Sequence, residues 1–217
     1  MRVLAINGSP RKKWNTATLL SHALDGARQA GAETRLVHLY ELDYKGCISC
    51  FECKKIGGKN YGRCAVKDGL TPLLEEAGQA DALILGSPVY FGAETGMFRS
   101  FFERLAFPYL TYTPGYASLF ARKIPTTLVY TMNVPEPAVK EWGYDVFMER
   151  MRGVMARTFG SCELFLSTDT CQFDDYAKYL STAWDAAAKR KRHEEVFPED
   201  CARAGALGRR LTEGLPA

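Results

Sequence analysis

The sequence predicts an α/β fold in which a doubly wound parallel sheet carries helices on both faces. Apolar runs of strand length alternate with segments of helical periodicity along most of the 217 residues. Residues 82–86 are continuously apolar, which is typical of a strand buried on both faces. Residues 2–27 form a strand, a tight turn and a helix in direct succession. Together these observations indicate a single domain built on a parallel sheet.

The first half of the chain supplies three strands and three helices. Residues 2–6 are apolar and partly β-branched, and Leu20, Leu24 and Ala27 then share one helical face. Residues 33–39 alternate polar and apolar side chains, as an edge strand does. The apolar positions of the next two helices, which lie before and after the strand at 82–86, are Leu70, Leu73, Leu74 and Ala77, then Met97, Phe98, Phe101, Phe102 and Leu105.

The second half supplies two further strands and ends in helices. Residues 124–131 and 163–167 are expected to be strands. Helices are expected over 146–159 and 176–192, and a short helix opens at Pro198. Five strands in alternation with helices imply a sheet that is covered on both sides.

Composition and charge exclude several classes of protein. Apolar residues make up 47% of the chain and charged residues 24%, as in an ordinary globular protein. The net charge of +3 is too small to indicate a nucleic-acid partner, and the basic run at 189–193 reads as a solvated helix end. No apolar stretch is long enough to cross a membrane, and no signal peptide is visible at the N-terminus. We therefore expect a cytoplasmic protein without a nucleic-acid or membrane partner.

The turn between the first strand and the first helix has the composition of a phosphate-binding loop. Backbone N–H groups and a helix N-terminus meet at such a turn and attract an anion. Its only glycine is Gly8, so the loop lacks the glycine pattern of a dinucleotide fingerprint. A terminal phosphate monoester, as in FMN, suits it better, although the same residues also suit a plain capped turn. The candidate side-chain donors are Ser9, Arg11, Asn15, Thr16 and Thr18.

Two other loops are expected to join this one. In open parallel sheets, ligands bind outside the carboxyl ends of the strands, at the point where the strand order reverses. Residues 8–16, 87–92 and 132–137 follow strands at that edge and are rich in polar, glycine and proline residues. Their agreement favours one ligand site built from all three loops.

Three motifs together resemble the NAD(P)H-dependent FMN reductase family, and within it the iron–sulfur flavoproteins. They are Gly-Ser-Pro-Arg followed by Asn-Thr, Cys-x-x-Cys-x-x-Cys, and Ser-Pro-Val-Tyr-Phe-Gly. The resemblance implies a flavodoxin-like five-stranded sheet of order 2-1-3-4-5, bound FMN, a homodimer or homotetramer, and electrons from NAD(P)H or a protein donor. The FMN-binding domain would span 1–192 with a cysteine-rich loop at 46–66, and 193–217 would form a C-terminal helical extension.

The same resemblance assigns residues to the cofactor. Ser9, Arg11, Asn15 and Thr16 would hold the FMN phosphate. No side chain is nominated as a general acid or base, because reduction of a flavin by NAD(P)H needs none. The residues expected along the isoalloxazine ring and ribityl chain are Pro88, Val89, Tyr90, Phe91 and Gly92.

The crowded cysteines need an explanation of their own. Cys47, Cys50 and Cys53 have the spacing with which thiolates converge on an iron–sulfur cluster, and Cys64 is the candidate fourth ligand of a [4Fe-4S] cluster. Ten residues separate Cys53 from Cys64, a longer gap than is usual in that family. Zinc is an alternative, and so is the absence of a metal, with free thiols or a disulfide. The three other cysteines are expected to be buried apolar residues: Cys162, Cys171 and Cys201.

The leading hypothesis for function is an FMN-dependent oxidoreductase. NAD(P)H would reduce it, and a quinone, a nitro compound or a flavin would accept the electrons. The aromatic stretch 106–124 and the loop 132–145 would shape the acceptor pocket or a subunit contact. The alternatives are a non-enzymatic electron carrier that relays electrons between redox proteins, and a cysteine-based redox sensor with a vestigial flavin pocket.

Overall fold

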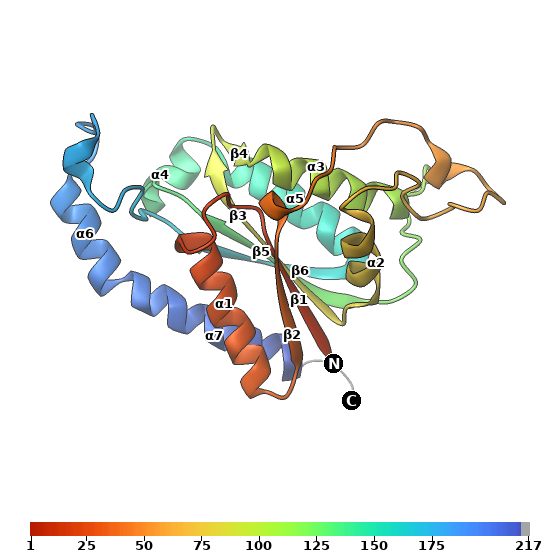
Figure 1. Ribbon diagram of the computed structural model, residues 1–217, viewed down its shortest axis with the longest axis horizontal. Coiled ribbons are helices and arrows are strands. Elements are labelled where there is room, and N and C mark those ends of the chain that lie inside the picture. The colour runs from red at the N-terminus through yellow and green to blue at the C-terminus, as the bar shows by residue number, and fades with distance from the viewer. Residues whose placement is uncertain (214–217) are drawn as a thin grey trace.

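The computed structural model describes residues 1–213 and shows an α/β fold with one twisted sheet (Figure 1). Five parallel strands follow the order β2-β1-β3-β5-β6, and the two-residue β4 pairs antiparallel with the end of β3. Without β4, this is the predicted order 2-1-3-4-5, which is confirmed. The strands are β1 (Arg2–Asn7), β2 (Glu33–His38), β3 (Ala82–Tyr90), β4 (Ala93–Glu94), β5 (Ile124–Thr131) and β6 (Gly160–Ser167).

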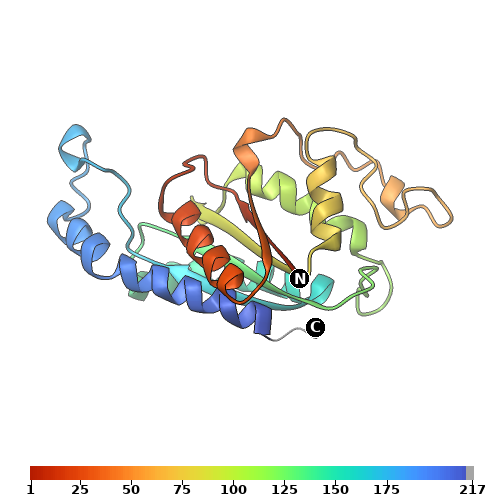
Figure 2. The ribbon, with the colours of Figure 1, turned by 60° about the horizontal axis from the view of Figure 1, so that its bottom comes forward.

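Helices cover both faces of the sheet, as Figures 1 and 2 show. One face packs against α1 and α7, and the other packs against α2, α3 and α5. The helices are α1 (Asn15–Gln29), α2 (Thr71–Gln79), α3 (Gly96–Ala106), α4 (Glu136–Glu141), α5 (Tyr144–Phe159), α6 (Ala186–Glu195) and α7 (Phe197–Glu213). Short 3-10 turns lie at η1 (Leu39–Glu41), η2 (Glu52–Lys54), η3 (Phe107–Tyr109) and η4 (Tyr176–Lys178). None of the helices within residues 1–213 is long and apolar enough to cross a membrane.

Strand alternation explains why the two faces hold separate cores. Along β1, Val3 and Ala5 face the α1–α7 side, and Leu4 and Ile6 face the α2–α3–α5 side. All four side chains are at most 2% exposed, because β1 lies between two neighbouring strands and under helices on both sides. Burying each of the three larger side chains, Val3, Leu4 and Ile6, stabilises the fold by about 1.5–3 kcal/mol.

The C-terminal helix α7 belongs to the core of this domain. It packs against α1 where the backbones of the two helices nearly touch: a Cβ at Gly26 would lie 1.9 Å from the Gly205 carbonyl oxygen. A Cβ at Gly208 would likewise lie 1.8 Å from the Ala23 carbonyl oxygen. The sequence predicted only a short helix from Pro198, but the helix that packs against α1 is 17 residues long. Residues 214–217 of the predicted extension lie outside the described part of the chain.

The prediction of one helix over 176–192 is wrong for the first half of that range. Only the turn η4 forms there, and Tyr179 folds back to stack on Phe173 with ring centroids 4.1 Å apart. The helix α6 begins at Ala186, where the Asp185 carboxylate accepts the N–H groups of Ala187 and Ala188. The segment expected as a loop after β5 contains the short helix α4.

Candidate functional site

The loops that follow β1, β3, β5 and β6 converge at the carboxyl edge of the sheet. This edge lies where α1 begins and where the β3–β4 hairpin projects, to the upper left of the centre of Figure 1. It is also where the order β2-β1-β3 reverses direction along the chain, the usual place for a ligand in this class of sheet.

The turn after β1 is locked by its own side chains. Asn7 is fully buried; its side chain accepts the Ser9 N–H at 3.0 Å and donates to the Ser9 carbonyl oxygen at 3.3 Å. The Ser9 hydroxyl in turn accepts the Arg11 N–H at 3.1 Å. Gly8 has no room for a side chain, since a Cβ would lie 2.8 Å from the Phe98 ring. The loop is thus held in one shape by short-range contacts.

The N-terminus of α1 is open toward this turn. Its N-cap is Trp14, and no side chain among the described residues caps the helix. The first N–H groups of a helix have no partner within it and carry its positive end. Asn15 and Thr16 at the helix start, and Ser9 in the turn, are each at most 6% exposed. The arrangement is that of an anion-binding site, as the sequence predicts.

Three of the predicted phosphate ligands have side chains that contact other segments of this edge. The Asn15 amide donates to the Cys171 carbonyl oxygen at 2.9 Å, and the Thr16 hydroxyl lies 2.7 Å from that of Thr131 on β5. Arg11 donates to the Gln172 carbonyl oxygen at 2.6 Å and lies 3.7 Å over the Trp14 ring. Arg11 and Asn15 thereby fasten the loop after β6 to the turn after β1. The first N–H groups of α1 keep no side-chain partner among the described residues.

The second predicted loop forms the β3–β4 hairpin. Pro88 and Val89 are half-buried, whereas Tyr90 is exposed and Phe91 projects fully into solvent. Phe91 and Gly92 both have left-handed backbones, with φ of 51° and 76°, which makes the tight turn. Partial burial of the Tyr90 side chain raises the pKa of its hydroxyl above the ordinary value, and the hydroxyl is protonated near neutral pH as in any tyrosine. The hairpin presents an apolar, aromatic edge beside the anion site.

Thr95 connects the two loops and is a residue that the sequence analysis missed. It is 1% exposed and caps α3 by accepting the Phe98 N–H at 3.2 Å. Its hydroxyl donates to the Gly8 carbonyl oxygen at 2.7 Å, and its own N–H donates to the Ser87 hydroxyl at 3.2 Å. A threonine directly before a helix start is a capping signal that could have identified it.

Lys189 secures the loops after β5 and β6 and was also missed. It is 3% exposed, donates to the Asn133 carbonyl oxygen at 2.7 Å and pairs with Asp169. Its ammonium lies 4.6 Å from the Trp184 ring centroid. In the sequence it belongs to the basic run that reads as a solvated helix end, because periodicity does not reveal a buried cation. The Asn133 Oδ1 atom beside it is buried and has no partner among the described residues.

The four clustered cysteines line one small cavity at the far end of α3. Cys47 and Cys50 are exposed, Cys53 is buried and Cys64 is half-buried. Phe107 and Pro108, from the aromatic stretch after α3, line the same cavity. Burial raises the pKa of the Cys53 thiol. Within residues 1–213, no three metal-ligating side chains already stand close enough to hold one ion.

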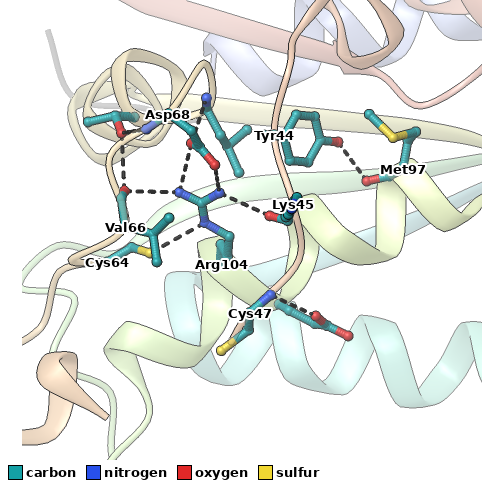
Figure 3. Close-up of polar contacts among 11 residues, drawn as sticks. Tyr44, Lys45, Cys47, Cys64, Val66, Asp68, Met97 and Arg104 are labelled. Carbon is teal, nitrogen blue, oxygen red and sulfur yellow. Dashed lines mark hydrogen bonds and ion pairs between the residues drawn. The ribbon is translucent and has the colours of Figure 1, made fainter. Parts of the chain in front are cut away.

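Helix α3 supplies two adjacent contacts to this cavity, which Figure 3 shows in detail. The Glu103 carboxylate accepts the Cys47 N–H at 3.2 Å, and Arg104 Nε donates to the Cys64 sulfur at 3.3 Å. The other three cysteines behave as expected in part, since Cys171 and Cys201 are buried and Cys162 is partly exposed. The structure thus brings the four predicted ligands to one cavity and leaves the other three apart from it.

The residues at the carboxyl edge fit FMN by the chemistry of their donors. An uncapped helix N-terminus with buried polar side chains suits a phosphate. The adjoining hairpin offers half-buried backbone and apolar side chains of the kind that border a flat ring. The unpartnered Asn133 Oδ1 marks a further acceptor at the same edge.

Known proteins match about half of this chain in sequence. An iron–sulfur flavoprotein of Archaeoglobus fulgidus is 38% identical over 104 residues, covering 48% of each chain. One from Methanocaldococcus jannaschii is 36% identical over 104 residues, covering 48% of this chain and 51% of that protein. The chain spans about half the length of the curated relatives it matches.

Solved structures match it along almost its whole length. An NAD(P)H:quinone oxidoreductase from Methanothermobacter marburgensis superposes with a TM-score of 0.69 at 17% identity, covering 97% of this chain and 98% of the other. An FMN-dependent NADH-azoreductase from Bacillus anthracis, in complex with FMN, gives 0.66 at 11% identity, with 98% and 100% coverage. These likenesses show the flavodoxin-like fold. The model of the family described as NADPH-dependent FMN reductase matches residues 1–130, and the chain belongs to that family.

Proposed function

We propose that this protein is an FMN-dependent oxidoreductase that takes electrons from NAD(P)H and passes them to a small acceptor such as a quinone, a nitro compound or a flavin. The observation that carries the proposal is the convergence of four loops on the uncapped N-terminus of α1. Membership of the reductase family supports it. The names of structural neighbours, a quinone oxidoreductase and an azoreductase, support the same class of acceptor.

The residues that would hold FMN divide into two groups. Backbone N–H groups at the start of α1, together with Ser9 and Arg11, would bind the phosphate. Asn15 and Thr16 would act through the loops they fasten, which fixes the shape of the phosphate site. Residues 88–92 would border the ribityl chain and the isoalloxazine ring.

FMN supplies the electron-transfer chemistry when bound, and the chain supplies orientation and access. The hairpin tip is exposed at Tyr90 and Phe91, so an acceptor can approach this edge from solvent. Val89 and Pro88 are half-buried and would exclude water from the inner side of the ring. The protonated Tyr90 hydroxyl can donate a hydrogen bond to a ligand near neutral pH.

Steady-state oxidation of NAD(P)H tests the proposal. Purified protein saturated with FMN is mixed with NADH or NADPH and with a quinone, a nitroaromatic compound or free FMN in turn. We expect turnover with at least one pair. FMN-loaded protein that turns over with none of them would instead be a non-enzymatic electron carrier, the alternative that the iron–sulfur flavoprotein relatives leave open.

We also propose that the cysteine cavity holds a [4Fe-4S] cluster bound by Cys47, Cys50, Cys53 and Cys64. Four thiols lining one cavity are the donor set of such a cluster, and the relatives bear the name iron–sulfur flavoprotein. Because the four side chains do not already form a site, cluster binding requires the loop to close around it. Iron and sulfide assays on anaerobically purified protein test this, and zinc or no metal would contradict it.

Assembly and location complete the proposal. The exposed apolar side chains of Phe91, Tyr179 and Leu180, which belong to loops after β3 and β6, favour a homodimer or homotetramer formed at the carboxyl edge of the sheet. Clustered thiols favour the reducing environment of the cytoplasm. Sedimentation equilibrium measures the oligomeric state, and a monomer at micromolar concentration contradicts it.

A further inference from the structure

Arg104 is a charged residue in the wall of the cysteine cavity, and its side chain is completely buried. It lies on the last turn of α3 with a side chain that is 0% exposed. An unpaired buried guanidinium is costly, so its partners must compensate for its loss of water. Those partners are shown in Figure 3.

All five N–H donors of Arg104 are used. Nη1 donates to the Lys45 carbonyl oxygen at 3.0 Å and to one Asp68 carboxylate oxygen at 2.5 Å. Nη2 donates to the Val66 carbonyl oxygen at 3.1 Å and to the other Asp68 oxygen at 3.0 Å. Nε donates to the Cys64 sulfur at 3.3 Å. A guanidinium has five donors in a planar fork, which a lysine ammonium cannot reproduce.

These partners lie on both sides of the cysteine motif in the chain. Lys45 precedes Cys47 by two residues, and Val66 follows Cys64 by two. Arg104 therefore ties together the two ends of the cysteine-rich segment, whose middle extends away from the domain (Figures 1 and 2). The Gly69 N–H also joins the two flanks by donating to the Asp43 carbonyl oxygen at 3.0 Å, so Arg104 adds a buried side-chain clamp above the base of the loop.

The neighbouring residue of the helix reaches the other end of the motif. Glu103 accepts the Cys47 N–H, while Arg104 donates to Cys64. Consecutive residues of one rigid helix thus fix the first and the last cysteine of the motif. The long gap between Cys53 and Cys64 is closed within the loop, where the Gly62 N–H donates to the Cys53 carbonyl oxygen at 3.0 Å, and α3 then holds Cys64 from outside the loop.

We propose that Arg104 is a positioning residue for the cysteine cavity: it clamps the two ends of the cysteine-rich segment and holds the Cys64 sulfur at the cavity wall as the fourth ligand of an iron–sulfur cluster. The inference rests on the cluster proposed above and is independent of FMN binding. A cationic donor to a ligand sulfur also stabilises the more negative, reduced cluster, so Arg104 raises its reduction potential.

Two variants of Arg104 test this in FMN-loaded protein reconstituted anaerobically with iron and sulfide. Arg104→Gln removes the charge and most of the fork, and we expect its iron and sulfide content per FMN to fall at least fivefold. Arg104→Lys keeps the charge but not the geometry. We expect it to bind less iron than wild type, and the cluster that forms to have a potential nearer to that of wild type than any residual cluster of Arg104→Gln.

Arg122→Gln is the matched control. Arg122 also donates to two carbonyl oxygens, those of Gly78 and Ala80, and pairs with Asp81 at 3.1 Å, but it touches no cysteine. We expect its iron content and cluster potential to equal those of wild type. If Arg104→Gln does not fold, the double variant Arg104→Gln/Asp68→Asn removes both charges, and the same loss of iron is expected.

Hydrogen exchange of the metal-free protein shows whether Arg104 holds the cysteine-rich segment in place before any cluster is bound. Before reconstitution, hydrogen exchange in residues 45–66 should be faster in Arg104→Gln than in wild type, with exchange in α1 unchanged. Normal iron content and potential in Arg104→Gln overturn the proposal. So does wild-type protein that binds FMN but takes up no iron, a result that leaves the reductase function standing. Wild-type protein that binds the cluster but not FMN contradicts only the reductase function.

Discussion

The hydroxyl of Thr95 donates a hydrogen bond to the carbonyl oxygen of Gly8, 2.7 Å away, and so joins the loop after β3 to the loop after β1. The same oxygen atom caps α3 by accepting the Phe98 N–H. One buried side chain thereby sets the position of the anion site, the hairpin beside it, and the helix that runs to the cysteine cavity.

Replacing Thr95 by valine should weaken both the fold and FMN binding. Thr95→Val removes the hydroxyl from two buried hydrogen bonds, and we expect it to lower the free energy of unfolding by about 2–3 kcal/mol. FMN affinity should also fall, because the two loops lose their link. Urea unfolding and FMN titration measure the two effects. Thr113→Val, at an exposed hydroxyl that bonds only to Thr111, is the control and should change neither.

Two glycine-to-alanine changes should have opposite effects on stability. In Gly8→Ala the new methyl group would lie 2.8 Å from Phe98 and 3.1 Å from the Gly86 carbonyl oxygen, and we expect a loss of about 1–3 kcal/mol with weaker FMN binding. In Gly153→Ala, within α5, the methyl group meets no described atom within 4 Å. That change should stabilise the protein by about 0.5–1 kcal/mol. Equal effects of the two would argue against the tight turn after β1.

Arg11 is expected to contribute to FMN binding directly. Arg11→Ala should weaken binding by about 1.5–3 kcal/mol, the range of a charge-assisted hydrogen bond. Arg28→Ala removes an arginine from the other end of α1, where it pairs with Asp25, and should leave the affinity unchanged. Isothermal titration of FMN-free protein with FMN measures both. An unchanged affinity in Arg11→Ala removes this residue from the site.

Asp68 should make stability depend on pH in the acid range. Burial raises its pKa, but hydrogen bonds and charge from Arg104, with the Leu70 N–H, outweigh burial and hold the pKa below its usual value. A carboxyl with a lowered pKa stabilises the fold above its unfolded pKa, and this stability is lost as pH falls through the folded value, below about pH 4. Asp68→Asn should remove that part of the pH dependence.

The same variant should also destabilise the protein at neutral pH. Asp68→Asn leaves the buried Arg104 without its counter-charge, and we expect a loss of about 3–5 kcal/mol. Asp25→Asn, at an exposed pair, should change stability by less than about 1 kcal/mol. Urea unfolding from pH 3 to pH 7 measures all three proteins. A wild-type acid profile in Asp68→Asn contradicts the role given to this pair.

Hydrophobic pattern was sufficient to predict the fold class. The continuous apolar run of β3 reflects burial on two faces, and the alternation in β2 reflects burial on one face. The strand order came from the resemblance to the flavodoxin-like family, and the structure confirms it. The pattern failed at α6, whose sequence has no apolar face and which is held instead by the Asp185 cap and the buried Lys189. The hydrophobic pattern also predicted too short a helix from Phe197. The reason is that this helix contacts α1 largely through glycines and alanines, which give a weak apolar pattern.

For the site, the sequence identified loops but not the contacts between them. Ser9 and the hairpin residues 88–92 lie at the predicted edge, because strand ends determine where loops meet. The bonds from Thr95 to Gly8 and from Arg104 to Cys64 join residues 87 and 40 positions apart. No local pattern contains such pairs, since they depend on how α3 is placed against two loops.

The most direct test of the central claim is reduction of the FMN-loaded protein by NADPH or NADH under anaerobic conditions. The two are mixed rapidly without an acceptor, and the visible absorbance of the flavin is followed. We expect this absorbance to bleach with at least one nucleotide and to return when a quinone is added. FMN-loaded protein whose absorbance is unchanged by both nucleotides, yet bleaches with a chemical reductant, contradicts an NAD(P)H-dependent oxidoreductase.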